Sequence, residues 1–117
     1  MFHERLTSLR EVVPGAQAVC LAASDGIAVE MTASDSVDVE VLAAEMVAMA
    51  QGIASEQRAL GIGMTDRLEV ATELYSVILQ RLREDYYLLL VVDADVPVGR
   101  ARFELRRAAP AFEEDLV

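Results

Sequence analysis

The most constraining feature of this sequence is an apolar run without alternation, YYLLLVV at residues 86–92. A strand with one face in water alternates apolar and polar residues, so a continuously apolar strand has to be covered on both faces. The segment AVCLAA at residues 18–23 has the same character. Two such strands need helices on both sides of their sheet, which predicts a three-layer α/β/α sandwich.

Other segments supply the rest of the sheet and its helices. Two segments alternate and suit edge strands, IAVEMT at residues 27–32 and LEVATEL at residues 68–74, and SVILQRL at 76–82 is expected to follow after a turn at 74–76. Helical spacing predicts helices at residues 2–13 and 36–60 and a last helix that begins after Asp95. The expected order is helix-β-β-helix-β-β-β-helix. This is a mixed α/β (α+β) fold with a five-stranded antiparallel sheet, in one domain over residues 1–117.

Asp25 and Gly26 separate the first two strands. An aspartate beside a glycine could be a functional acid next to a flexible residue. Asp-Gly is also a strong signal for a tight hairpin turn, because glycine adopts positive φ without a Cβ clash. The turn is the preferred interpretation.

A second acidic junction lies in VVDADVPVGRARFELRR, residues 91–107. Asp93 falls where the strand leaves the sheet, Asp95 is expected to cap the last helix, and Pro97 is expected in its first turn. A cation loop would need further oxygen ligands, and the next residues are apolar or glycine. The segment is therefore interpreted as a joint between strand and helix, in which only Gly99 is unexplained by helix propensity.

The helix predicted at residues 36–60 is apolar over more of its surface than packing on one sheet requires. Asp35 or Ser36 is expected to cap its start, and Gly61 or Gly63 to end it. A broad stripe is expected to face the core, together with Met31 and Met64: Leu42, Met46, Met49, Ile53 and Leu60. A second strip is small and weakly polar: Val37, Val41, Ala44, Ala48 and Ser55.

Two interpretations of the small strip remain open. Small side chains four residues apart, such as Ala44 and Ala48, let another helix approach closely, which favours a contact between subunits. Alternatively, the N-terminal segment or a loop of the same chain covers the strip.

The composition excludes several classes of enzyme. Cys20 and His3 are the only cysteine and histidine, so neither a catalytic triad nor a histidine-based zinc site can be assembled within one chain. The chain has no lysine, which rules out a phosphate-loop lysine. Asp25, Asp93 and Asp95 have no base or nucleophile beside them in the sequence. We therefore expect no catalytic residue, no metal and no cofactor.

The formal net charge of −10 disfavours nucleic acid as a partner. The apolar runs are far shorter than the roughly 18–20 residues of a membrane span, and the N-terminal segment lacks a signal-peptide pattern. No membrane insertion and a cytoplasmic location are expected. Four arginines gather in the last helix, where a solvated face is preferred over a binding patch: Arg100, Arg102, Arg106 and Arg107.

The order of these elements and their amino-acid sequences resemble the Roadblock family, of the dynein light chain type. The matching segments are VPGAQAVCLAASDGIAVE in the first hairpin, VEVLAAEMVAMAQGIASEQRALGIG in the long helix and LLLVVDADVPVGRARFELRRAAP at the last strand and helix. In this family the final strand commonly runs into an acidic turn, then a glycine with an arginine or other polar residue soon after and an apolar helix. Asp93, Gly99 and Arg102 fit that pattern. The resemblance covers residues 4 to 112 and is greatest to the bacterial MglB-like type.

The resemblance implies a non-catalytic dimeric regulator or scaffold of Roadblock/profilin-like fold. Such a protein binds a small Ras-like GTPase and modulates its nucleotide cycle or localisation, often in cell polarity or motility. Long helices pair and edge strands adjoin in the dimer, which gives this expected interface: Val41, Ala44, Ala48, Gln51, Ser55, Leu68, Val70 and Thr72. The candidate partner contacts are Glu45, Arg58 and Arg100. The alternative is a dimeric adaptor or ligand-sensing module without a GTPase partner.

Overall fold

The computed structural model describes residues 1–83 and 85–116. The helices are α1 (Phe2–Val12), α2 (Val39–Leu60) and α3 (Val98–Asp115). The strands are β1 (Ala16–Ala23), β2 (Ala28–Ala33), β3 (Arg67–Ala71), β4 (Tyr75–Arg81) and β5 (Tyr86–Asp93). Their order along the chain is the predicted one.

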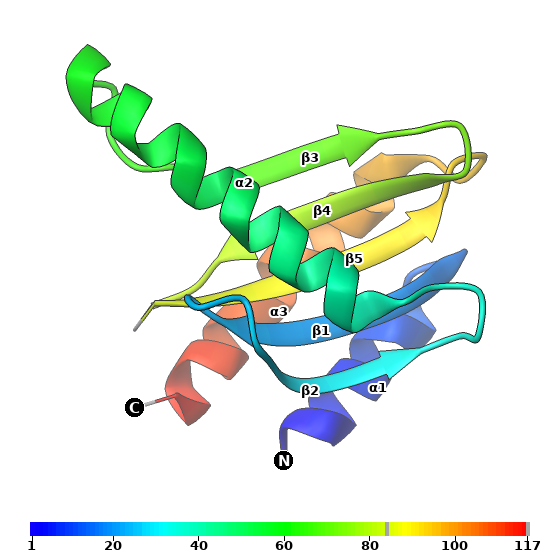
Figure 1. The fold of residues 1–117 in the computed structure, drawn as a ribbon. Coiled ribbons are helices and arrows are strands. Elements are labelled where there is room, and N and C mark those ends of the chain that lie inside the picture. The colour runs from blue at the N-terminus through cyan, green and yellow to red at the C-terminus, as the bar shows by residue number, and fades with distance from the viewer. Residues whose placement is uncertain (84, 117) are drawn as a thin grey trace.

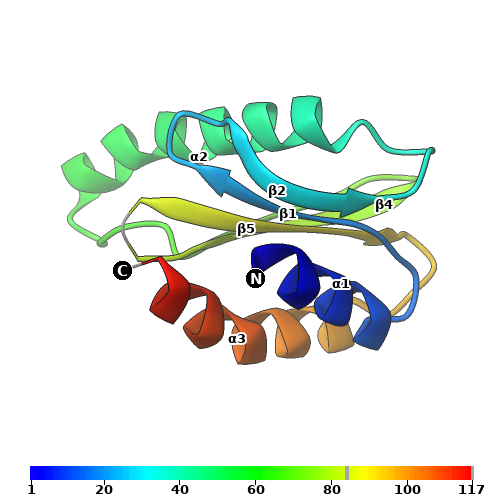
Figure 2. The ribbon, with the colours of Figure 1, turned by 90° about the horizontal axis from the view of Figure 1, so that it is seen from below.

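The five strands form one antiparallel sheet in the spatial order β2-β1-β5-β4-β3. Helix α2 covers one face, and α1 and α3 lie side by side on the other (Figures 1 and 2). The predicted three-layer α/β/α sandwich is confirmed. The edge positions of β2 and β3 and the burial of β1 and β5 on both faces are confirmed as well.

Each face of the sheet has its own core. Val19 and Leu21 of β1 belong to the core under α1 and α3, which also contains Phe112. The alternate residues of β1 face α2 and are all short: Ala18, Cys20 and Ala22. Short side chains on both surfaces let a helix lie close to the sheet, and α2 accordingly contributes alanines to this core.

Helix α2 begins later than predicted. Asp38 is its N-cap, and the Asp38 Oδ1 accepts a hydrogen bond from the Val41 backbone N–H at 3.4 Å. The predicted cap Ser36 instead lies 2.8 Å from the Ser34 hydroxyl, in a turn that precedes the helix. The predicted end is confirmed, since Gly61 adopts a left-handed conformation with φ of 69°.

The first hairpin turn is as predicted. Gly26 has a φ of 85°, and its N–H donates to the Ala23 carbonyl at 2.9 Å. The Asp25 Oδ1 accepts a hydrogen bond from the Ile27 N–H at 3.0 Å. Asp25 therefore shapes the turn.

The joint before α3 is a turn, but its cap is not the predicted one. The Asp93 carboxylate accepts hydrogen bonds from Gln17 Nε2 at 3.1 and 3.2 Å, which ties the end of β5 to β1. Helix α3 starts at Val98 with Pro97 as N-cap, so Asp95 as a cap and Pro97 in the first turn were wrong. A residue before proline avoids the helical region, so Val96 cannot begin a helix.

Strand β3 ends at Ala71, earlier than predicted. The Thr72 Oγ1 accepts hydrogen bonds from the N–H groups of Leu74 at 3.3 Å and Tyr75 at 3.1 Å. This bonding bends the chain directly after Ala71. Thr72 consequently belongs to the β3–β4 turn.

Candidate functional site

Helix α2 leaves large apolar side chains in solvent. Its buried residues are Val39, Ala43, Met46, Val47 and Ala50. Met49, Ile53 and Leu60, predicted to face the core, are 44%, 38% and 71% exposed. Met64 is also exposed, so its assignment to the core was wrong. Leu60 is exposed because the C-terminal end of α2 projects beyond the sheet and has no strand beneath it (Figure 1). Met49 is exposed for another reason, since Val47 and Ala50 beside it are buried and Met49 lies on a side of the helix turned away from the sheet.

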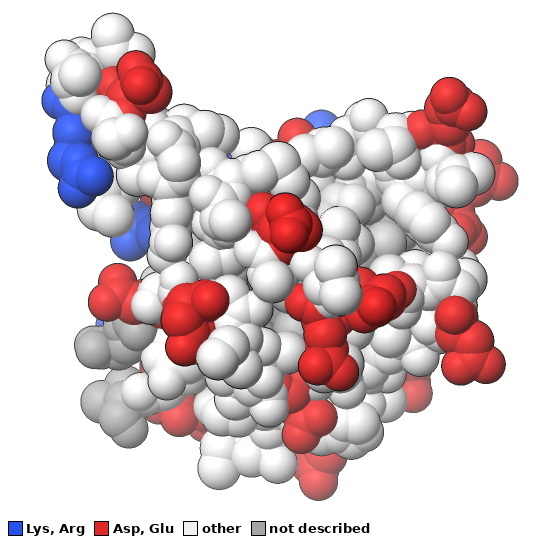
Figure 3. Space-filling view, in the orientation of Figure 1, with Lys and Arg blue, Asp and Glu red and all other residues white. Residues whose placement is uncertain are grey.

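The small strip of α2 is exposed. We define the α2 outer face by Val41, Ala44, Glu45, Ala48, Met49 and Gly52, all of which are exposed. Figure 3 shows this surface as largely uncharged and interrupted by acidic side chains. The N-terminal segment does not cover it, because α1 lies on the opposite face of the sheet (Figure 2).

The β1–β2 turn contacts one flank of this face. The Gln51 side-chain amide donates a hydrogen bond to the Ser24 carbonyl, so this predicted interface residue already has a partner within the chain. A Cβ placed at Gly26 would lie 3.2 Å from the Ala44 Cα. The turn therefore sets the position of α2 beside the small strip.

Strand β3 is hydrogen-bonded to β4 and ends the sheet order, which leaves its other edge unpaired among the described residues. Leu68 and Val70 point to the α2 side of the sheet and are half-buried against that core. An unpaired edge can accept another strand. The structure thus brings the predicted residues of β3 and α2 to the same side of the sheet.

Glu69, between these two residues, points to the opposite face. Arg102 Nε of α3 donates to its carboxylate oxygens at 3.0 and 2.8 Å, and Arg67 Nε donates at 2.8 Å. The hydrogen bond from Arg102 is the main cause that lowers the pKa of Glu69 below its ordinary value of 4.5. The helical pattern had placed Arg102 on a solvated face and gave no sign of this pair, which ties α3 to the edge strand.

Glu69→Gln should therefore lower stability in a pH-dependent way. Because the folded-state pKa of Glu69 is lowered, its ion pair stabilises the protein fully above pH 4.5 and loses this effect as the pH falls through the lowered pKa. Urea unfolding of wild type and variant should differ at neutral pH and converge in acid. Glu73→Gln, at an exposed position, is the control. A difference that persists unchanged in acid would contradict the ion-pair explanation.

The three predicted partner contacts do not lie together. Glu45 and Arg58 are exposed on α2, and Figure 3 shows basic side chains at its projecting C-terminal end. Arg100 is on α3, on the other face of the sheet (Figure 2). A single flat partner surface therefore cannot contact both Arg58 and Arg100.

A cavity of about 530 Å³ lies beside the C-terminal half of α2, lined by residues that include Gln57, Arg58, Thr65, Arg81 and Tyr87. Arg81 connects β4 to the segment after α2 in the lining of this cavity, since the Arg81 Nε donates to the Thr65 carbonyl at 3.2 Å. Leu60, Ile62 and Met64 nearby are each about 70% exposed. This cavity was not predicted from the sequence, although glycines on both sides of Ile62 keep its segment out of α2.

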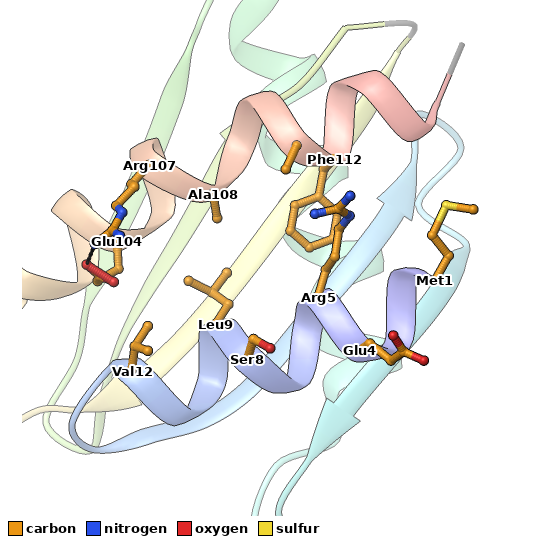
Figure 4. A pocket seen from close by; sticks show the side chains of 11 residues that line it. Met1, Glu4, Arg5, Ser8, Leu9, Val12, Glu104, Arg107, Ala108 and Phe112 are labelled. Carbon is orange, nitrogen blue, oxygen red and sulfur yellow. Dashed lines mark ion pairs between the residues drawn. The ribbon is translucent and has the colours of Figure 1, made fainter.

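A groove of about 650 Å³ separates α1 from α3 (Figure 4). Leu9, Ala108 and Phe112 line it, with Glu104 and Arg107 toward one end and Met1 toward the other. Arg5 Nε and Asp115 Oδ2 form an ion pair at 2.6 Å. The groove was not predicted. Its lining includes Ser8 and Glu4 but neither histidine nor cysteine.

The Cys20 thiol, a strong nucleophile when ionised, lies in the core beneath α2. Cys20 is fully buried, and burial raises the pKa of its thiol to about 12. The thiolate required of a nucleophile therefore does not form near neutral pH. No group of three or more His, Cys, Asp or Glu side chains suited to a metal occurs within residues 1–83 and 85–116. No helix there has the length and apolar character needed to cross a bilayer.

Comparisons with known proteins give similarity in structure only. No protein-family model matches the sequence, and no curated protein shows significant sequence similarity to it. MglB of Myxococcus xanthus superposes with a TM-score of 0.87 at 13% identity, covering 97% of this chain and 93% of that protein. A Roadblock/LC7 domain from Streptomyces avermitilis has a TM-score of 0.76 at 18% identity, covering 97% and 96%.

A third structure, MglC of Myxococcus xanthus, has a TM-score of 0.72 at 27% identity, covering 97% of this chain and 98% of MglC. These likenesses define a protein of the Roadblock/LC7 fold. Within that class, the chain has an MglB-like architecture. The resemblance stated from the sequence is confirmed at the level of the fold.

Proposed function

We propose that this chain is a non-catalytic, dimeric regulator or scaffold that binds a small Ras-like GTPase and modulates its nucleotide cycle or localisation, in cell polarity or motility. The observation that carries the proposal is the exposed α2 outer face beside the unpaired edge of β3, on an MglB-like fold. An exposed surface made mostly of small and apolar side chains is typical of a protein interaction site.

The small side chains of this surface support the proposed dimer. Two copies related by a twofold axis would bring Ala44 and Ala48 against their symmetry mates, where small side chains permit close helix contact. Leu68 and Val70 would flank the pair where the β3 edges adjoin. The proposed interface retains Val41 and Ser55, while Gln51 and Thr72 contribute from its margin because both make hydrogen bonds within the chain.

Action on a GTPase would be indirect. The chain carries no phosphate-loop motif and no lysine, so it would reorder the partner's switch segments or supply an arginine to its transition state. Arg58 is exposed near the end of α2, and Leu60 and Ile62, which follow it closely in the chain, are exposed as well. We therefore place the partner contact at Arg58, with Glu45 at the margin of the proposed dimer contact, and not at Arg100.

The test is multiple-turnover GTP hydrolysis and release of labelled GDP by a Ras-like GTPase from the same source, with and without this chain. We expect a change of at least about tenfold in one rate, as arginine contacts to GTPases typically produce more than this. Arg58→Gln should reduce the effect, and Arg106→Gln on the opposite face should leave it intact. Binding without a rate change would limit the role to tethering.

A second candidate is a dimeric adaptor or ligand-sensing module. The cavity beside Arg58 favours it, because its volume of about 530 Å³ is in the range that small ligands occupy. Failure to bind any Ras-like GTPase of the same source, with the dimer intact, would support this candidate and overturn the first.

A further inference from the structure

The outer face of α3 combines one aromatic side chain with exposed arginines. We define it by Gly99, Arg100, Phe103, Arg106 and Arg107, all exposed. Phe103 is 59% exposed, whereas every other aromatic side chain among the described residues is buried or half-buried. This face lies on the opposite side of the sheet from α2 (Figure 2).

Its charge is opposite to that of the whole chain. The net charge is −10, yet three of the five exposed arginines, Arg100, Arg106 and Arg107, lie within this helix. Glu104 Oε1 lies 3.8 Å from Arg100 Nε and 3.6 Å from Arg107 Nη1, and only 6% of the Glu104 side chain is exposed. One buried carboxylate thus lies near two arginines and offsets only one of their charges, so the net charge of the face remains positive.

No contact within the chain explains why residue 99 is a glycine. A Cβ at this position would meet nothing within 4 Å. The residue lies in regular helix, where glycine is less favourable than alanine. It precedes Phe103 by one helical turn, so the two share a face and Gly99 leaves bare backbone beside the ring. A partner that approaches this backbone would account for the glycine.

We propose that the outer face of α3 is a docking surface for an acidic protein segment carrying one large apolar side chain. The apolar side chain packs on Phe103 over Gly99, and carboxylates pair with Arg100, Arg106 and Arg107. Arginines beside an exposed aromatic ring are the composition of an interaction hot spot. The inference goes beyond the proposed function and is independent of it, since the docked segment would not touch the α2 outer face, where the dimer contact is proposed.

Other occupants fit less well. Nucleic acid would meet the field of a chain with net charge −10. A second copy would have to place a different, acidic surface against α3, which is a heterologous contact between two strongly negative molecules. A short acidic segment meets the same net charge, but its few carboxylates can all be paired by Arg100, Arg106 and Arg107. Nucleic acid is a continuous row of phosphates and would need a longer basic stripe.

The test uses the full chain and a short synthetic peptide of glutamates around a central leucine as the probe. Backbone amide shifts should change at Gly99, Phe103 and Arg106, and binding should weaken as salt is raised. Phe103→Ala and Arg106→Gln should each weaken binding by about tenfold. Leu74→Ala and Arg58→Gln, exposed positions elsewhere, should not.

Three results would overturn the proposal. One is equal affinity for a peptide with alanine in place of leucine, which would mean simple charge attraction. Another is equal affinity for the matching lysine peptide, and the third is a set of shifted amides located on α2. Gly99→Ala separates folding from docking, because it should raise the melting temperature and still weaken binding of the leucine peptide. Stronger binding by this variant would contradict the role of the bare backbone.

Discussion

Ala48→Glu should convert the dimer into a monomer. Ala48 is exposed at the centre of the α2 outer face, where a twofold contact would bring two introduced carboxylates close together. An unpaired charge buried in an interface costs about 3–5 kcal/mol. The dissociation constant should therefore rise by roughly two to four orders of magnitude. Because Ala48 is not part of either core, the fold of the monomer should be unchanged.

Light scattering across a range of protein concentrations measures this effect, and circular dichroism checks the fold. Ala33→Glu is the matched control, because Ala33 is an exposed alanine on β2, at the other edge of the sheet. This control should remain dimeric. A wild-type chain that is monomeric at tens of micromolar, or an Ala48→Glu variant that dimerises normally, would remove the basis of the proposed interface.

The architecture could be predicted because burial on both faces leaves a strong pattern. YYLLLVV and AVCLAA have no polar face, so only a sheet between helices accommodates them. The Asp25–Gly26 turn could be predicted for a similar reason, since its conformation depends on local residues alone. Predicting these features does not require knowing where any helix or strand ends.

The face that α2 buries could not be predicted, because a helical wheel does not show where the sheet beneath it ends. Leu60 has the hydropathy of a core residue but lies where α2 projects beyond the sheet. Met49 is exposed although Val47 and Ala50 are buried, because the wheel also does not show which of two adjacent apolar stripes the sheet covers. The Arg102–Glu69 pair was missed for another reason, since its residues are 33 positions apart and lie on different elements. Side-chain contacts at such separation depend on the tertiary structure.

Gly26→Ala should destabilise the protein more than the same substitution at Gly61, the glycine that ends α2. Gly26 has a φ of 85°, where an L-residue is strained by about 1–3 kcal/mol. The new Cβ would also lie 3.2 Å from the Ala44 Cα, closer than an optimal carbon contact. Because the neighbour is backbone, no side-chain rotation can relieve the contact. Either the hairpin turn or α2 has to move.

Gly61→Ala is the matched control for backbone strain. Gly61 has a φ of 69°, and a Cβ there meets nothing within 4 Å, so this variant carries the strain without the contact. Urea unfolding of both variants should show a larger loss for Gly26→Ala. Since Ala44 belongs to the α2 outer face, moving the helix there should also weaken the dimer, while Gly61→Ala should leave it intact. Equal effects of the two variants on stability and dimerisation would show that the β1–β2 turn does not position this face.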